Sequence, residues 1–179
     1  MTLSHSPNQN RILAGLPPAD YARLLPDLEL VSVPVGEGIY EPDIRITHLY
    51  FPIDCIVAWI GELASGAAFQ TAIAGNEGMV GLSYLLGCES AQARAVVLSG
   101  GSAFRINASL LKKEFESGGA LQRLLLRFTH AMMVQTTLLA VSARHYSIEQ
   151  QKTGSNRRDR VSARSPDRSE SSGTGGACR

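Results

Sequence analysis

Histidine side chains are the residues of this chain whose type first suggests metal chemistry. Zinc or iron sites built from imidazoles need three or four converging ligands, and a metal-binding jelly-roll barrel commonly supplies a His-x-His pair with a third, distant histidine. Only His48 falls in the part of the sequence that is patterned like a barrel. His130 and His145 lie in a predicted helix, and His5 lies near the N-terminus. We therefore expect no metal site.

The cysteine and serine patterns do not indicate covalent catalysis or a bound cofactor. Cys55, Cys88 and Cys178 are odd in number and contain no C-x-x-C pair, which argues against a disulfide framework and a thiolate metal site. No G-x-S-x-G sequence presents a serine nucleophile. The glycine run at residues 99–102 does not open a helix, so we interpret it as a hairpin turn. We predict no catalytic residues, no enzymatic activity and no cofactor.

Charge separates the body of the chain from its C-terminal end. The formal net charge is +1, but residues 151–179 hold seven basic and three acidic side chains, which leaves about −3 on everything before them. Sequence-specific binding of nucleic acid needs a basic face backed by a folded reading element. Residues 152–179 have almost no large aliphatic side chains, so they cannot offset the entropy of ordering the backbone. We interpret them as a disordered, basic, low-complexity tail that does not read DNA sequence.

No segment of the sequence predicts membrane insertion or export. No apolar run reaches the roughly 18 residues that a transmembrane helix requires. The first ten residues are polar and lack the charged and apolar regions of a secretory signal. We expect a cytoplasmic protein.

The middle of the chain is patterned as short strands. Between about residue 28 and residue 106, runs rich in β-branched side chains alternate with turn sequences that contain Gly, Pro, Asn or Asp. Short strands with frequent turns and few helices between them favour an antiparallel barrel or jelly roll over βαβ units. The predicted strands are Leu30–Val35, Ile44–Phe51, Cys55–Ile60, Phe69–Ile73, Arg94–Leu98 and Ala103–Ile106.

Helices are predicted on both sides of this β region. Residues 1–28 contain two short helices, over Asn8–Leu16 and Tyr21–Leu28, with Pro18 near the start of the second. Asn107 is a plausible N-cap for a short helix that ends at the two glycines of residues 118–119. We assign residues 28–119 to one domain, made of the β region and this short helix.

A long helix predicted over residues 120–151 is apolar on two faces. Its two columns of apolar residues at heptad spacing are two residues out of phase, so they lie about 200° apart around the helix. The barrel can cover one face, and the same helix of a second copy is the natural cover for the other. We therefore predict a homodimer, whose interface draws on Leu125, Met132, Val134, Leu139 and Val141.

The order of these elements resembles the effector-binding half of Crp/Fnr-type bacterial transcription regulators, whose cyclic-nucleotide-binding-like domain is a double-stranded β-helix followed by a long dimerisation helix. The stretches that carry the resemblance span about residues 11–150. They are RILAGLP at residues 11–17, VGEGIYEP at residues 35–42, ITHLYFP at residues 46–52 and GNEGMVG at residues 75–81.

The resemblance places the ligand cassette near residues 81–95. Family members that bind cyclic nucleotides hold the ribose with a glutamate after a glycine, and the phosphate with an arginine. Here Gly81 is followed by Leu82 and Ser83, and Arg94 with Ala95 matches the arginine position. These five residues form the predicted ligand site. Because leucine replaces the carboxylate, we expect cyclic AMP to bind weakly or not at all.

The resemblance stops at the end of the long helix. The family continues into a helix-turn-helix domain, whereas this sequence continues into the low-complexity tail, a pattern that we interpret as truncation or a frameshift. We predict an effector-sensing regulatory domain that has lost sequence-specific DNA binding. The alternatives from other classes are a stand-alone module that binds a small ligand or a protein, and a cupin-like metal enzyme.

Overall fold

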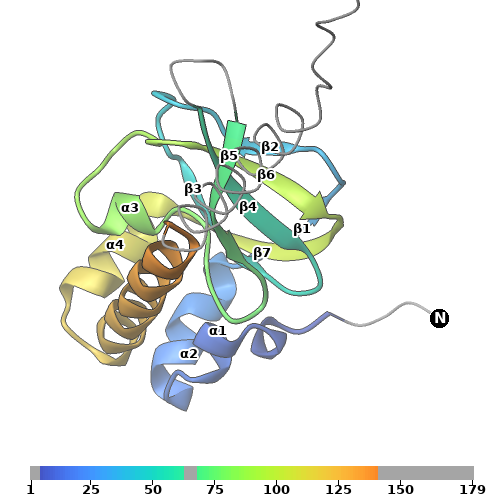
Figure 1. The fold of residues 1–179 in the computed structure, drawn as a ribbon. Helices are drawn as coiled ribbons and strands as arrows, with labels where there is room; N and C mark the ends of the chain where they lie inside the picture. Colours follow the sequence, from blue (N-terminus) through green and yellow to red (C-terminus); the bar gives the residue numbers. More distant parts are fainter. Residues whose placement is uncertain (1–4, 63–67, 141–179) are drawn as a thin grey trace, which may run out of the picture. The chain divides into compact units, whose positions relative to one another are not determined.

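The computed structural model describes residues 5–62 and 68–140, and their strands form two antiparallel sheets (Figure 1). One sheet has the order β1-β7-β3 and the other has the order β2-β6-β4-β5. The prediction of a mainly β jelly roll is confirmed. The strands are β1 (Glu29–Val33), β2 (Gly38–Tyr40), β3 (His48–Pro52), β4 (Ile56–Glu62), β5 (Ala68–Ala74), β6 (Arg94–Ser99) and β7 (Gly101–Asn107).

Three details of the strand prediction are wrong, the first being that β2 was not predicted. The strand expected from Ile44 begins only at His48, and Arg45 before it makes an isolated bridge to Ser90. The run at residues 99–102 joins β6 to β7, which belong to different sheets, so it is not a hairpin turn. A Cβ on Gly101 would lie 2.5 Å from a carboxylate oxygen of Asp54, which explains why glycine stands where the chain crosses between the sheets.

Short helices close the ends of the β-roll as the sequence predicts. The second N-terminal helix begins at Pro18, where the missing N–H of proline is tolerated. Asn107 caps α4, because its Oδ1 accepts a hydrogen bond of 2.9 Å from the Ser109 backbone N–H. The helices are η1 (Pro7–Gln9), α1 (Arg11–Ala14), α2 (Pro18–Leu24), η2 (Leu25–Asp27), α3 (Leu82–Leu85), α4 (Ala108–Glu116) and a helix that spans residues 120–140.

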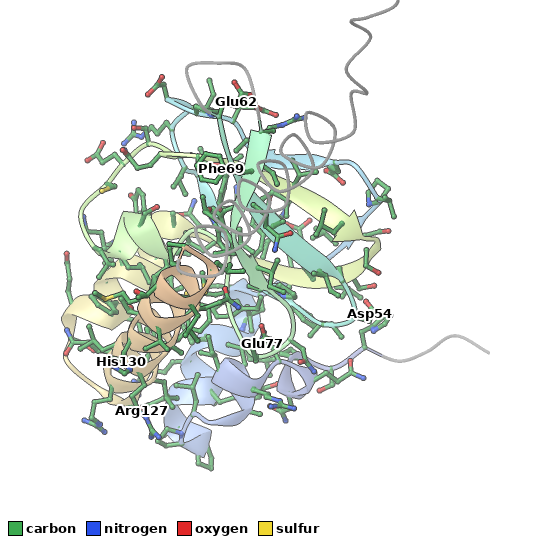
Figure 2. The ribbon with its side chains drawn as sticks, viewed as in Figure 1. Asp54, Glu62, Phe69, Glu77, Arg127 and His130 are labelled. Atoms are coloured by element: carbon green, nitrogen blue, oxygen red, sulfur yellow. The ribbon has the colours of Figure 1, made fainter. Side chains whose placement is uncertain are left out.

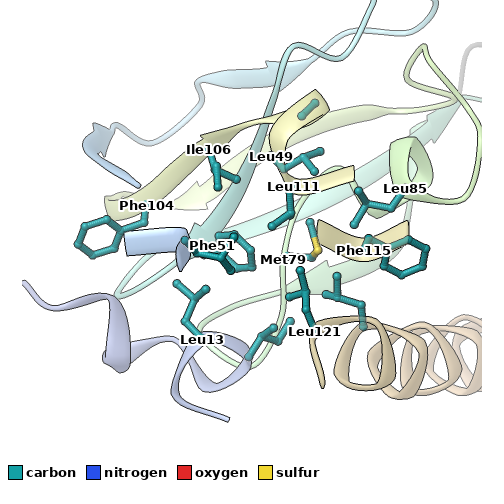
Figure 3. Packing of buried hydrophobic residues seen from close by; sticks show 14 of the residues in the cluster. Leu13, Leu49, Phe51, Met79, Leu85, Phe104, Ile106, Leu111, Phe115 and Leu121 are labelled. Atoms are coloured by element: carbon teal, nitrogen blue, oxygen red, sulfur yellow. The ribbon is translucent and has the colours of Figure 1, made fainter. Parts of the chain in front are cut away.

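The main core lies between the three-stranded sheet and the helices (Figure 3). Leu49 and Phe51 of β3 meet Leu111 of α4 and Leu121 of the last helix, and all four are fully buried. A second, smaller core draws residues from both sheets. Its buried members are Val33, Cys55, Val57, Val80, Ala95, Val97 and Ala103.

The helix of residues 120–140 has one face on the body and an opposite face that is open. Leu121 and Leu125 are buried in the main core, and Phe128 packs against it. About half a turn around the helix from Leu125, Val134 and Leu138 are exposed. The part of the predicted long helix beyond residue 140, which includes Val141, lies outside the described residues, as does the predicted tail of residues 152–179. No described helix is long and apolar enough to cross a bilayer.

Candidate functional site

A cleft of about 250 Å³ opens between the four-stranded sheet, α3 and the last helix. Three parts of the chain that are distant in sequence contribute its walls, and we call it the Trp59 cleft. Side chains of β4 and β5 form one wall, α3 with Met79 forms the second, and the helix of residues 120–140 forms the third. The lining residues are Trp59, Thr71, Ala72, Met79, Leu82, Ser83, Phe128, Met132 and Thr136.

The lining of the Trp59 cleft is apolar apart from three hydroxyls and the indole of Trp59, whose N–H can donate a hydrogen bond. Thr71 Oγ1 donates to the Trp59 carbonyl at 3.2 Å, and Thr136 Oγ1 donates to the Met132 carbonyl at 2.9 Å. Their hydroxyl protons are therefore used within the chain, while their oxygen lone pairs can accept from a ligand. None of the described lining residues is charged. At ~30 Å³ per water-sized group, the cleft suits an uncharged ligand of about eight non-hydrogen atoms.

The start of α3 is held in place by Gly81. This residue is buried and has φ +99°, in the left-handed region that favours glycine. A Cβ here would lie 2.5 Å from Leu49 Cδ2 and would also contact the Tyr40 hydroxyl. That hydroxyl is itself fixed, because it donates to the His48 carbonyl at 2.6 Å, and burial raises the pKa of Tyr40 well above its ordinary value. The close packing orients Leu82 and Ser83 toward the cleft.

The structure brings only part of the predicted ligand cassette together. Leu82 and Ser83 line the Trp59 cleft, and Gly81 positions them. Arg94 does not line it, since its Nε donates to Glu41 Oε1 at 3.0 Å on the surface, where both side chains are about half exposed.

Ala95 is buried in the smaller core and pairs with Trp59 across β4 and β6. Sequence reasoning missed the cleft's other residues, because they come from elements that are distant in sequence.

The predicted dimer residues fall on different surfaces. Leu125 is fully buried in the chain's own core, and Met132 lines the Trp59 cleft. Val134 and Leu139 are exposed, at 46% and 37% of their surface.

The histidines and cysteines within the described residues do not form a cluster that could bind a metal ion. No three His, Cys, Asp or Glu side chains within residues 5–62 and 68–140 are placed to hold a metal ion together. Cys88 is exposed, whereas Cys55 is buried, and its burial raises the pKa of the thiol.

Comparison with solved structures finds close matches in fold. The N-terminal domain of a transcriptional regulator from Streptomyces coelicolor A3(2) matches with a TM-score of 0.55 and 16% identity, over 75% of this chain and 95% of that one. The sensor domain of the regulator DNR from Pseudomonas aeruginosa matches with a TM-score of 0.56 and 14% identity, over 70% and 88%. The chain has the β-roll fold of cyclic-nucleotide-binding-type sensor domains. The resemblance to Crp/Fnr-type sensors is thus confirmed at the level of fold.

A longer regulator chain is matched over only part of its length. The c-di-GMP-responsive global regulator CLP from Xanthomonas campestris matches with a TM-score of 0.59 and 16% identity. The match covers 69% of this chain and 62% of the regulator. Neither a protein-family model nor a curated protein matches the sequence. The likeness therefore lies in the fold, and ligands and partners have to be argued from the site.

Proposed function

We propose that this chain is the sensing part of a Crp/Fnr-type transcription regulator, and that it binds a small uncharged effector in the Trp59 cleft. The observation that carries the proposal is the composition of the cleft walls. One ligand would contact Trp59 and Thr71 on the barrel together with Met132 and Thr136 on the last helix. Ligand binding and self-association are the roles that we assign, and catalysis has no part in the proposal.

A ligand in the Trp59 cleft would act on the position of the last helix. Besides its apolar contacts, this helix is joined to β5 by a hydrogen bond of 3.2 Å from the Ile73 backbone N–H to Gln135 Oε1. A ligand can shift an equilibrium between two helix positions only if it binds them with different affinity. Contacts with both the barrel and the helix provide that difference, since they change whenever the helix moves against the sheet.

The ligand prediction can be tested through Trp59, the only tryptophan of the chain. Cyclohexanol, an uncharged probe of suitable size, should change the Trp59 fluorescence in a saturable way at millimolar concentration. Replacing Ser83 with Phe should fill the cleft and weaken this response at least tenfold. Cyclic AMP should produce no saturable response at micromolar concentration, because Leu82 offers no acceptor and Arg94 is paired with Glu41.

A matched control is available at Ser109. This exposed serine lies on α4 and not in the cleft, so Ser109→Phe should leave the cyclohexanol response unchanged. Equal responses from the Ser83 and Ser109 variants would show that the probe binds elsewhere. Micromolar binding of cyclic AMP would show that the cassette has been assigned to the wrong residues.

Self-association through the open face of the last helix is the second part of the proposal. The face holds a set of large apolar side chains that the body does not cover. A second copy of the chain would bury this surface in the way that two helices pack along a seam of heptad-spaced residues. The exposed apolar residues of this face are Leu126, Met133, Val134 and Leu138.

Charge on the open face should separate the two copies. The double variant Met133→Glu with Val134→Glu places carboxylates in a surface that excludes water in the dimer, so its dimer dissociation constant should rise at least 100-fold. Leu110→Glu is the control, because Leu110 is an exposed helical leucine on α4. Sedimentation equilibrium at tens of micromolar should find a dimer for the parent and for the control. A monomeric parent would contradict the proposal.

A further inference from the structure

A second cleft, of about 320 Å³, lies on the other side of the last helix from α3. Its walls come from α1, from the loop that follows β5 and from the helix itself, and we call it the Arg11 cleft. Figure 2 labels Glu77 on the loop and Arg127 on the helix. The lining residues are Arg11, Ile12, Ile73, Glu77, Leu124, Arg127, Phe128, Ala131, Met132 and Gln135.

The Arg11 cleft differs from the Trp59 cleft in its charge. It contains two guanidinium groups, from Arg11 and Arg127, and one carboxylate, from Glu77. The ion pairs within residues 5–62 and 68–140 involve neither Arg11 nor Arg127. Glu77 Oε1 accepts a hydrogen bond of 2.9 Å from the Gly75 backbone N–H, which holds its carboxylate against its own loop. The lining therefore carries a formal charge of +1 with both arginines available.

The walls of the Arg11 cleft are fixed by hydrogen bonds and close packing. The Arg11 backbone N–H donates to the Asn76 carbonyl at 2.8 Å, which ties α1 to the loop. A Cβ on Gly78 would lie 2.5 Å from ring atoms of Phe128, so the ring rests directly on the loop backbone. Phe128 and Leu124 form an apolar floor beside the guanidinium groups. A preformed cleft of this kind loses less entropy on binding than a mobile one.

From these features we infer that the Arg11 cleft binds a small organic carboxylate with an apolar body. Guanidinium groups pair with carboxylates through charge-assisted hydrogen bonds, and two of them outweigh the repulsion from Glu77. At ~30 Å³ per water-sized group, 320 Å³ accommodates about ten non-hydrogen atoms, the size of octanoate. The Arg11 cleft shares Phe128 and Met132 with the Trp59 cleft. Its charged residues do not line the Trp59 cleft, so the inference does not rest on the proposed effector site.

Calorimetric titration of the whole chain with octanoate tests this inference. We expect a dissociation constant on the order of 0.1–1 mM, typical of a good ligand of about ten atoms, and binding at least tenfold weaker for the uncharged octanamide. Arg11→Gln and Arg127→Gln should each weaken octanoate binding about fivefold to tenfold, since both side chains are exposed and partly screened. Glu77→Gln should tighten it about twofold to fivefold, because it removes the repulsive charge.

Arg123→Gln is the matched control. Arg123 lies on the same helix and is also exposed, but it does not line the cleft, so octanoate binding should not change. An equal loss of octanoate affinity in the Arg123 and Arg127 variants would contradict binding in the Arg11 cleft, because the general positive charge of the helix would then explain the binding. Equal affinity for octanamide, or no binding of octanoate at 10 mM, would contradict the inference that the cleft binds a carboxylate. Weaker octanoate binding in the Glu77 variant would contradict the inference as well, because Glu77 would then contribute to binding instead of repelling the carboxylate.

Discussion

Replacing Gly81 with Ala should lower the free energy of unfolding by about 3–4 kcal/mol, a large part of the stability of a domain this size. The first cause is the backbone. Gly81 has φ +99°, and a side chain at positive φ costs roughly 1–2 kcal/mol because its Cβ approaches neighbouring backbone atoms.

The second cause is the space around Gly81. The new methyl group would contact Leu49 Cδ2 at 2.5 Å and the Tyr40 hydroxyl. Leu49 is fully buried in the main core, and the Tyr40 hydroxyl donates to the His48 carbonyl at 2.6 Å, so neither neighbour can move without loss. Overpacking of this kind costs about 1–3 kcal/mol.

A change at Gly87 distinguishes the cost of a side chain at positive φ from the cost of overpacking. It has φ +105° at the other end of α3, but a Cβ there would meet no atom within 4 Å. Gly87→Ala should therefore lose only the backbone part, about 1–2 kcal/mol. Urea unfolding followed by Trp59 fluorescence should show the Gly81 variant less stable than the Gly87 variant by about 2 kcal/mol. Equal losses would mean that Gly81 is not held by Tyr40 and Leu49.

The strands were predictable where a β-branched run was long enough to contrast with its flanking turns. Six of the seven strands coincide with such runs, and their boundaries differ from the predicted ones by a few residues. The strand that was not predicted is β2, which has only three residues and begins with Gly38, so local composition gave no signal for it. It is a strand because β6 provides hydrogen-bond partners for it, which is a tertiary cause.

For the last helix, the periodic pattern predicts the apolar faces but not which of them packs on the body. Heptad spacing alone indicates two apolar faces about half a turn apart, and the described residues include Leu125, Met132 and Leu139 of one column and Val134 of the other. It does not say which face meets the body, because either column could pack on a barrel. In the structure Leu125 takes the buried side, while Val134 and Leu138 lie on the open side.

The ligand cassette was predicted through a linear motif, and only its local part matches the Trp59 cleft. Leu82 and Ser83 are adjacent in sequence and remain together in the cleft. Trp59 and Thr136 come from distant elements, so no spacing rule could pair them. Arg94 was expected to face an anion, but Glu41, more than fifty residues earlier in the sequence, pairs with it on the surface.

Removing the side chain of Asn10 should destabilise the chain about as much as the Gly81 change. Asn10 is fully buried and makes four hydrogen bonds to backbone groups. Its Oδ1 accepts from the Ile12 and Leu13 backbone N–H groups at 3.0 and 3.3 Å and so caps α1. Its Nδ2 donates to the Pro52 and Gly78 carbonyls at 3.0 and 2.8 Å. Asn10→Ala loses the cap and leaves two buried carbonyls unpaired, about 3 kcal/mol in total.

Asn10→Asp should separate the cap from the long-range contacts. Aspartate is as good an N-cap as asparagine, but it has no amide donors. Its second oxygen would face the Pro52 and Gly78 carbonyls in a buried place, which disfavours the charged form. The pKa of this carboxyl in the folded state should therefore rise above its ordinary value of about 3.9. The folded state then holds its proton to a higher pH than the unfolded state, so the variant loses stability relative to the parent as pH rises.

Asn107→Asp is the control with the opposite sign. Asn107 caps α4 from an exposed position, where a charged carboxylate interacts favourably with the helix N-terminus. Its folded-state pKa should be lowered, so this variant should gain stability relative to the parent as pH rises through about 4. Urea unfolding at pH 3, pH 5 and pH 8 measures both differences. Parallel trends in the two variants would show that Asn10 acts only as a helix cap, and that its amide does not join α1 to β3 and to the loop before Gly81.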